Sequence, residues 1–113
     1  MSLEKDLYDC LKTIKGGIYA LIAPQNDKRP YSVYQIISDI KTTALKEQCD
    51  FPQIRFQIDV YSEDIIECMD IKDDIELKLL ANTDIKCIIY QSFSNVTDEG
   101  RVFRSTIDFK LTY

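Results

Sequence analysis

The stretch "QIRFQIDVYSED" (residues 53–64) decides how this chain folds, because its hydrophobic period changes within it. From Ile54 to Tyr61, apolar and polar side chains alternate one for one, which is typical of a β-strand with one buried face. From Ser62 onward, apolar residues recur every three or four positions, which indicates a helix. The polar positions of the strand form one row, which is either a chemical site or the outer surface of a sheet.

The residues after this strand carry the start and stop signals of a helix. Ser62 is the expected N-cap, and Glu63 and Asp64 suit the positive end of the helix dipole. Helix-forming residues then continue to about Leu80, before Asn82. The sequence therefore predicts a strand that leads directly into a long helix.

This predicted helix carries two apolar stripes, whereas a helix packed on a sheet needs to bury only one. The first stripe comprises Ile65, Cys68, Ile75 and Leu79, and the second comprises Ile66, Met69, Leu77 and Leu80. Contiguous apolar surface that a monomer leaves exposed is typical of interaction sites. We therefore predict that the second stripe faces a partner.

The part of the chain before residue 53 predicts one helix and two strands. Ser2 is the expected cap of a helix through Leu3, Leu7, Cys10, Leu11 and Ile14, which Gly16 and Gly17 end. A short apolar run from Ile18 to Ala23 precedes a loop between Pro24 and Pro30. Residues 31–40 are rich in aromatic and β-branched types and predict a strand, whereas residues 41–52 are polar and predict a loop.

The C-terminal part predicts a hairpin, with strands at residues 85–93 and 101–113 and a turn at 94–100. The element order is then helix, three strands, helix, two strands. This order predicts an α+β fold with a single mixed or antiparallel sheet of about four to five strands and two helices packed on one face. A length of 113 residues fits a single domain, residues 1–113.

Composition narrows the class of protein. With 45% hydrophobic and 29% charged residues the chain is an ordinary globular sequence, and no apolar run approaches the roughly 18 residues of a membrane span. The N-terminus lacks the features of a signal peptide, so we expect synthesis and use on the cytoplasmic side, with no membrane partner. The net charge of −5 and the scattered basic residues disfavour adhesive nucleic-acid binding.

The sequence lacks the residues that several classes of catalytic site require. The chain contains no histidine, which removes histidine-dependent nucleophile arrangements and histidine metal sites. The cysteines at positions 10, 49, 68 and 87 form no C-x-x-C pair, and we expect reduced thiols that are mostly core residues. We predict no enzyme activity, no catalytic residue and no cofactor.

The densest acidic group lies on the predicted second helix, where Asp70, Asp73 and Asp74 are spaced closely enough to share a divalent cation. A metal-dependent hydrolase is therefore one alternative. The loop spacing and glycine of an EF-hand are missing, so a solvated helix face explains these residues better, and we predict no metal site.

A candidate subunit or partner interface follows from the outward strand row, the tyrosines, the second helical stripe and the last turn. Tyrosine is favoured where a large apolar surface must also tolerate water. The candidate residues are Tyr31, Tyr34, Arg55, Gln57, Asp59, Tyr61, Ile66, Met69, Asp98 and Glu99.

Three segments carry a resemblance to a known family: "RPYSVYQIIS" (29–38), "IRFQIDVYSED" (54–64), which leads into a helix, and "RSTIDFKLTY" (104–113). Taken in this order, they resemble the tail-completion, or tail-terminator, proteins of long-tailed bacteriophages and prophages. The resemblance covers most of the chain, from the first helix to the last strand. Its motifs are patterns of sheet residues, and it transfers no catalytic or binding residue to a position of this chain.

The resemblance implies a structural role in the virion, after assembly in the host cytoplasm. Such proteins form a ring, typically a hexamer, at the head-proximal end of the tail tube, where the ring stops tube polymerisation and joins the tail to the head–tail connector protein. DNA would pass through the lumen without specific binding. The alternatives are another head–tail connector protein, of the head-completion or stopper type, and a non-viral intracellular adaptor domain that binds a cellular protein.

Overall fold

The computed structural model describes residues 3–20, 30–40, 53–83, 85–97 and 102–112. Two helices and five strands follow one another in the order α-β-β-β-α-β-β, which confirms the predicted α+β fold. The elements are α1 (Leu3–Leu11), β1 (Ile18–Ala20), β2 (Tyr31–Ile40), β3 (Gln53–Ser62), α2 (Ile65–Ala81), β4 (Lys86–Thr97) and β5 (Val102–Thr112).

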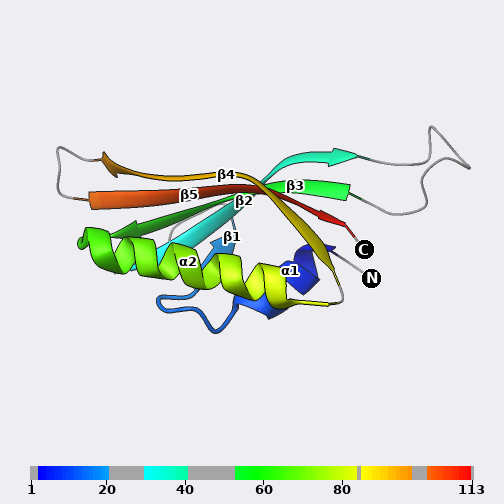
Figure 1. Cartoon of the computed structure of the whole chain (residues 1–113), viewed down its shortest axis with the longest axis horizontal. Coiled ribbons are helices and arrows are strands. Elements are labelled where there is room, and N and C mark those ends of the chain that lie inside the picture. Colours follow the sequence, from blue (N-terminus) through cyan, green and yellow to red (C-terminus); the bar gives the residue numbers. More distant parts are fainter. Residues whose placement is uncertain (1–2, 21–29, 41–52, 84, 98–101, 113) are drawn as a thin grey trace, which may run out of the picture.

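The five strands form one mixed sheet, with both helices on the same side of it (Figure 1). The strand order is β1-β2-β3-β5-β4, in which β1 pairs parallel with β2 and every other pair is antiparallel. β3 therefore lies at the centre and β4 at an open edge. The opening stretch of the sequence is the central strand of the fold.

The core lies between the sheet and the helices. The apolar positions of β3 at Phe56, Ile58 and Val60 are completely buried, as the alternation predicts. The other completely buried apolar residues are Leu7, Leu11, Cys68, Ile75, Leu79, Ile107, Phe109 and Leu111. Phe56 stacks on Phe109 across the β3–β5 pair, with ring centroids 5.7 Å apart. The first predicted stripe of α2 thus faces the core, where Ile71 joins it.

The junction between β3 and α2 differs from the prediction by two residues. Asp64, not Ser62, is the N-cap, because its carboxylate accepts a hydrogen bond of 2.9 Å from the amide of Ile66. Ser62 is the last residue of β3, and its hydroxyl accepts from the amide of Asp64 (3.1 Å) and donates to Glu67 (2.7 Å). Ser62 therefore fixes the turn that precedes the helix.

The ends of two other elements also differ from the prediction. Helix α1 ends at Leu11 rather than at the two glycines, which shape the following turn with φ values of 86° and 79°. A Cβ on Gly16 would lie 2.2 Å from the carbonyl oxygen of Pro30, so this close approach requires glycine. β4 continues to Thr97, because Ser94 to Thr97 pair with β5, so the first part of the predicted turn is strand.

Parts of several predictions lie outside the described residues. These are the cap at Ser2, the end of the apolar run after Ala20, most of the loop between Pro24 and Pro30, the loop at 41–52 and the rest of the last turn. No helix within the described ranges is long and apolar enough to cross a membrane.

Two neighbouring leucines of α2 test which face packs on the sheet. Leu79 is completely buried and Leu80 is 59% exposed. Leu79→Ala should lower the free energy of unfolding by about 2–5 kcal/mol, because it leaves a cavity in the core. The matched control Leu80→Ala should change it by less than about 0.5 kcal/mol. Urea denaturation measures both values, and equal losses would contradict the assigned helix orientation.

Candidate interaction surfaces

The polar row of β3 is bound to its neighbour β5 across the outer face of the sheet. Arg55 donates two hydrogen bonds to Asp108, of 2.9 and 2.7 Å, and its guanidinium lies 4.6 Å from the ring centroid of Tyr90. Asp59 accepts hydrogen bonds from Thr106 (2.7 Å) and from Gln57 (3.2 Å). These polar groups thus have partners within the chain and stabilise the sheet from its outer face.

The candidate tyrosines lie on opposite faces of the sheet. Tyr31 and Tyr61 face outward together, with ring centroids 5.3 Å apart, and Tyr31 is buried in the chain. Tyr34 faces inward, against Phe56, and its hydroxyl donates a 2.7 Å hydrogen bond to Glu4. Burial, together with this carboxylate, raises the pKa of Tyr34 to about 12. Tyr34 is therefore a core residue of the described chain, since strand alternation turns it away from the outer face.

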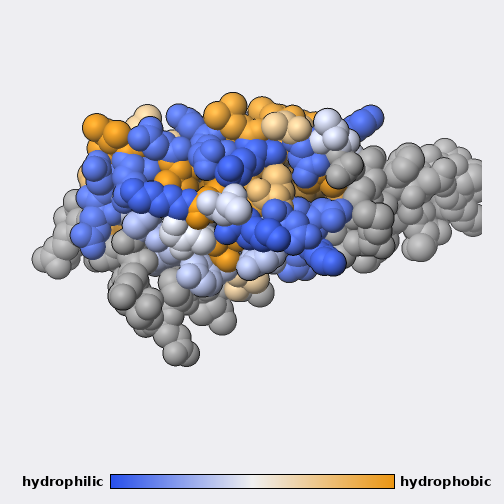
Figure 2. Space-filling model, turned by 90° about the horizontal axis from the view of Figure 1, so that it is seen from below, coloured by the Kyte–Doolittle hydropathy of each residue, from blue (hydrophilic) through white to orange (hydrophobic). Residues whose placement is uncertain are grey.

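The second apolar stripe of α2 lies on the surface. Ile66, Met69, Leu77 and Leu80 are 66%, 44%, 68% and 59% exposed. Asp73 lies on the same line of the helix, because positions 66, 69, 73, 77 and 80 follow one another at steps of three or four residues. Viewed from the helix side, the molecule shows hydrophobic side chains along one long margin and polar ones across the middle (Figure 2). We call Ile66, Met69, Leu77 and Leu80 the helix strip. These side chains are exposed in the single chain, and their contact with a partner stays a prediction.

A second exposed apolar surface lies on the outer face of the edge strand β4. Ile88, Tyr90 and Phe93 are 49%, 49% and 39% exposed, and Tyr90 occupies a β-bulge between Ile89 and Gln91. We call Ile88, Tyr90 and Phe93 the sheet strip. Sequence reasoning missed it, because the segment was assigned only to a hairpin. The sequence signal for this strip is that "IIYQSF" places apolar residues on both faces of one strand, whereas packing on the core requires only one apolar face.

Two of the ten candidate residues, Asp98 and Glu99, lie outside the described residues. The structure brings Arg55, Gln57, Asp59 and Tyr61 together in the polar row, whereas Ile66 and Met69 lie on the other layer of the molecule, in the helix strip. The eight described candidate residues therefore do not form one surface.

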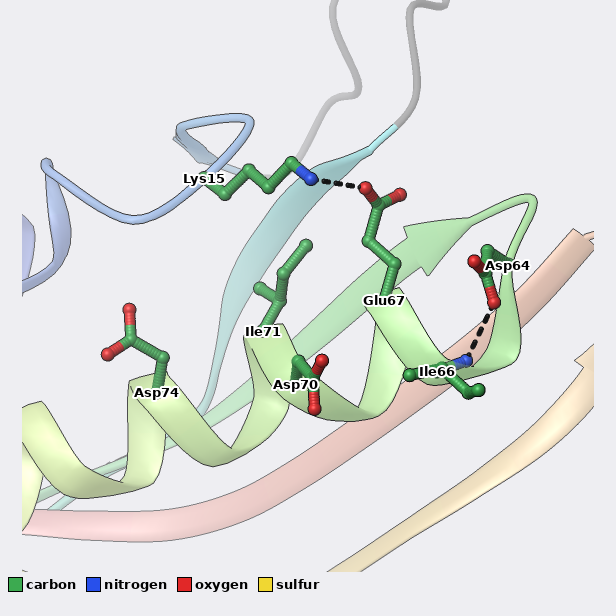
Figure 3. A pocket seen from close by; sticks show the side chains of 7 residues that line it. All are labelled: Lys15, Asp64, Ile66, Glu67, Asp70, Ile71 and Asp74. Carbon is green, nitrogen blue, oxygen red and sulfur yellow. Dashed lines mark hydrogen bonds and ion pairs between the residues drawn. The ribbon is translucent and has the colours of Figure 1, made fainter.

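Four acidic residues of α2 and its N-cap line a surface hollow of about 430 Å³: Asp64, Glu67, Asp70 and Asp74 (Figure 3). Glu67 forms an ion pair with Lys15 across the hollow, and this pairing raises the pKa of Lys15 and lowers the pKa of Glu67, with help from Ser62. The carboxylates of Asp64, Asp70 and Asp74 do not converge on one point (Figure 3). In the part of the chain that the structure describes, no three histidine, cysteine or acidic side chains are grouped to hold a metal ion.

The described cysteines are free thiols, of which Cys68 is buried and Cys10 and Cys87 are half-buried. Cys68 is completely buried, and its sulfur lies 3.3 Å from the carbonyl oxygen of Val60 and 3.2 Å from the hydroxyl of Ser105. Burial raises the pKa of Cys68, and it raises the pKa of Cys87 to about 11. A nucleophilic cysteine needs a lowered pKa, so these two thiols are packing groups.

A scan against protein-family models finds none that matches the sequence, and a search of curated proteins finds no significant match. The fold does have a solved counterpart in a structure described as the virion of native gene transfer agent (GTA) particle. The match to one of its chains has a TM-score of 0.60 and 11% sequence identity, and it covers 94% of this chain and 82% of that chain. The two chains share a fold. At this identity the likeness concerns the fold alone.

The burial of Cys68 predicts very slow modification of the native protein. At pH 8 a soluble disulfide reagent should modify Cys68 at least about a hundredfold more slowly than it does in urea, because access requires local unfolding. The control variant Leu77→Cys places a thiol at an exposed position of the same helix and should react like a free cysteine. Mass spectrometry of digested samples distinguishes the sites, and equal rates at positions 68 and 77 would contradict the packing of α2.

The ion pair of Glu67 predicts a pH-dependent contribution to stability. Its pKa is lowered in the folded chain, so the contribution is complete above the unfolded pKa and is lost as the pH falls through the lower folded pKa. Glu67→Gln should therefore lower the melting temperature at pH 7 and have a smaller effect at pH 3. Asp70→Asn, in the same hollow, is the control, and an effect of Glu67→Gln that is equal at both pH values would contradict a charge-based role.

Proposed function

We propose that this protein is a structural component of a phage-like virion that forms a ring, of six subunits by resemblance, at the head-proximal end of a tail tube. The observation that carries the proposal is the fold shared with a chain of the gene transfer agent virion over 94% of this chain. In the described residues, the three segments that resemble tail-terminator proteins lie chiefly in β2, in β3 with the N-cap of α2, and in β5. They therefore include the three central strands of the shared fold.

The surfaces of the chain support a role in assembly. A monomer gains nothing from an exposed apolar helix strip or from a twelve-residue edge strand with an apolar outer face. Both features become useful when identical subunits contact one another and when a ring meets other components. In this proposal the components are the tail tube protein on one side and the head–tail connector protein on the other.

The chemistry of the chain supports a structural rather than a catalytic role. The sequence lacks histidine, and burial suppresses the nucleophilicity of the two thiols described above. The net charge of −5 fits a ring through which DNA passes without adhering, because like charges repel. In this account the acidic residues of α2 require no bound metal.

Removal of the gene from its phage or prophage tests this role. Without the protein, electron micrographs of lysates should show tails of uncontrolled length and heads without tails, because nothing ends tube growth or joins the two parts. The wild-type gene supplied in trans should restore joined particles, and mass spectrometry should find the chain in them. Tails of normal length beside heads that have lost DNA would favour a stopper at the head instead. Complete infectious particles without the protein would contradict a virion role.

A further inference from the structure

The helix strip and the sheet strip lie on opposite layers of the molecule and have matching dimensions. The helix strip runs from Ile66 to Leu80, which spans about 21 Å at 1.5 Å per helical residue. The sheet strip runs from Ile88 to Phe93, which spans about 17 Å along a strand. An apolar ridge on one side of the chain is therefore matched by an apolar strip of similar length on the other side.

The two layers carry opposite charge in the described residues. α2 and its N-cap carry six acidic side chains and only two basic ones. The acidic residues are Asp64, Glu67, Asp70, Asp73, Asp74 and Glu76, and the basic residues are Lys72 and Lys78. The outer face of β3, β5 and β4 carries four basic side chains and two acidic ones. The basic residues are Arg55, Lys86, Arg104 and Lys110, and the acidic residues are Asp59 and Asp108. Contact between a helix layer and a sheet layer would thus join an acidic surface to a basic one.

Local detail strengthens this match. Exposed Asp70 and Asp73 lie next to or within the helix strip, whereas Lys86 and Lys110 lie beside Ile88 on the sheet face. Asp108 already neutralises Arg55, so the lysines supply much of the free positive charge of the sheet face. Opposite charges around an apolar centre are the usual arrangement of a specific interface.

We propose that the helix strip of one copy packs against the sheet strip of a second copy of this chain. This inference rests on the proposed function, because it assigns the contact between neighbouring subunits of the ring. A second copy is the occupant that both halves of the complementary surface support, since the same chain carries both. The two halves differ, so the contact is heterologous, and repeated contacts give a closed ring when the rotation between copies allows closure.

Two surface variants of the full-length chain test the contact. Ile66→Ser with Leu77→Ser removes the helix strip, and Ile88→Ser with Phe93→Ser removes the sheet strip, while all four positions are exposed in the single chain. Each variant alone should stay monomeric in light scattering, whereas the wild type associates. Mixed in equal amounts, the two variants should form a one-to-one dimer that grows no further, because each retains one intact surface. Circular dichroism and thermal melting check that both are folded.

Charge reversal provides an independent test that leaves the apolar residues in place. Asp70→Lys with Asp73→Lys should weaken self-association by about tenfold or more, and so should Lys86→Glu with Lys110→Glu. An equimolar mixture of the two reversed chains should recover association, because contacts between unlike chains join either two reversed surfaces or two normal ones, and both pairs are complementary. A single chain that carries all four changes should recover it, since both surfaces are then reversed together.

Three results would overturn the proposed contact: a wild-type chain that stays monomeric at about 1 mM, a mixture of strip variants that forms no dimer, or a strip variant that associates as the wild type does. The experiments can contradict the contact without contradicting the proposed function, and the reverse. If strip variants still complete virions in trans, the function stands and the contact is wrong. If the mixed dimer forms but virions are complete without the protein, the contact stands and the function is wrong.

Discussion

Burial of one face of β3 is the constraint on which the rest of this structure depends. Phe56, Ile58 and Val60 are completely inaccessible, and they lie in the middle strand of the sheet, between β2 and β5. A shift of this strand by one residue would place Arg55, Gln57 and Asp59 in the core, at a cost that no local adjustment could offset. The strand therefore fixes the register of both neighbours and the side on which the helices pack.

The same constraint explains how the side chains of the outer polar row are held. A central strand has a neighbour on each side, and its outward side chains meet partners on those neighbours. Arg55 with Asp108, and Asp59 with Thr106, are such cross-strand pairs. Groups that are held by hydrogen bonds within the sheet contribute to its rigidity, whereas exposed apolar side chains, such as those of the helix strip and the sheet strip, stay accessible for contact.

Sequence periodicity was sufficient to predict the helices and strands, but it could not predict which of them lie next to one another. The alternation in β3 and the two stripes of α2 identify buried and exposed faces, because each depends only on residues close in sequence. Strand order and side-chain partners depend on residues that are far apart in the sequence. The hydrophobic pattern therefore could not predict the pairing of Asp108 with Arg55 or the edge position of β4. Tyr34 shows the limit clearly: a tyrosine in a strand fits either face, and only the register with Ile58 places it inward.

The predicted ends of some elements were wrong for a related reason, because the ends depend on individual hydrogen bonds rather than on hydrophobic periodicity. Ser62 and Asp64 are both good capping residues, and the choice between them follows from the length of β3, which continues to Ser62 by pairing with Phe103. Once Ser62 is held in the sheet, its hydroxyl can reach the amide of Asp64 and the carboxylate of Glu67, and Asp64 becomes the cap. The tertiary position of the strand thus selects between two caps that local propensity rates as equal.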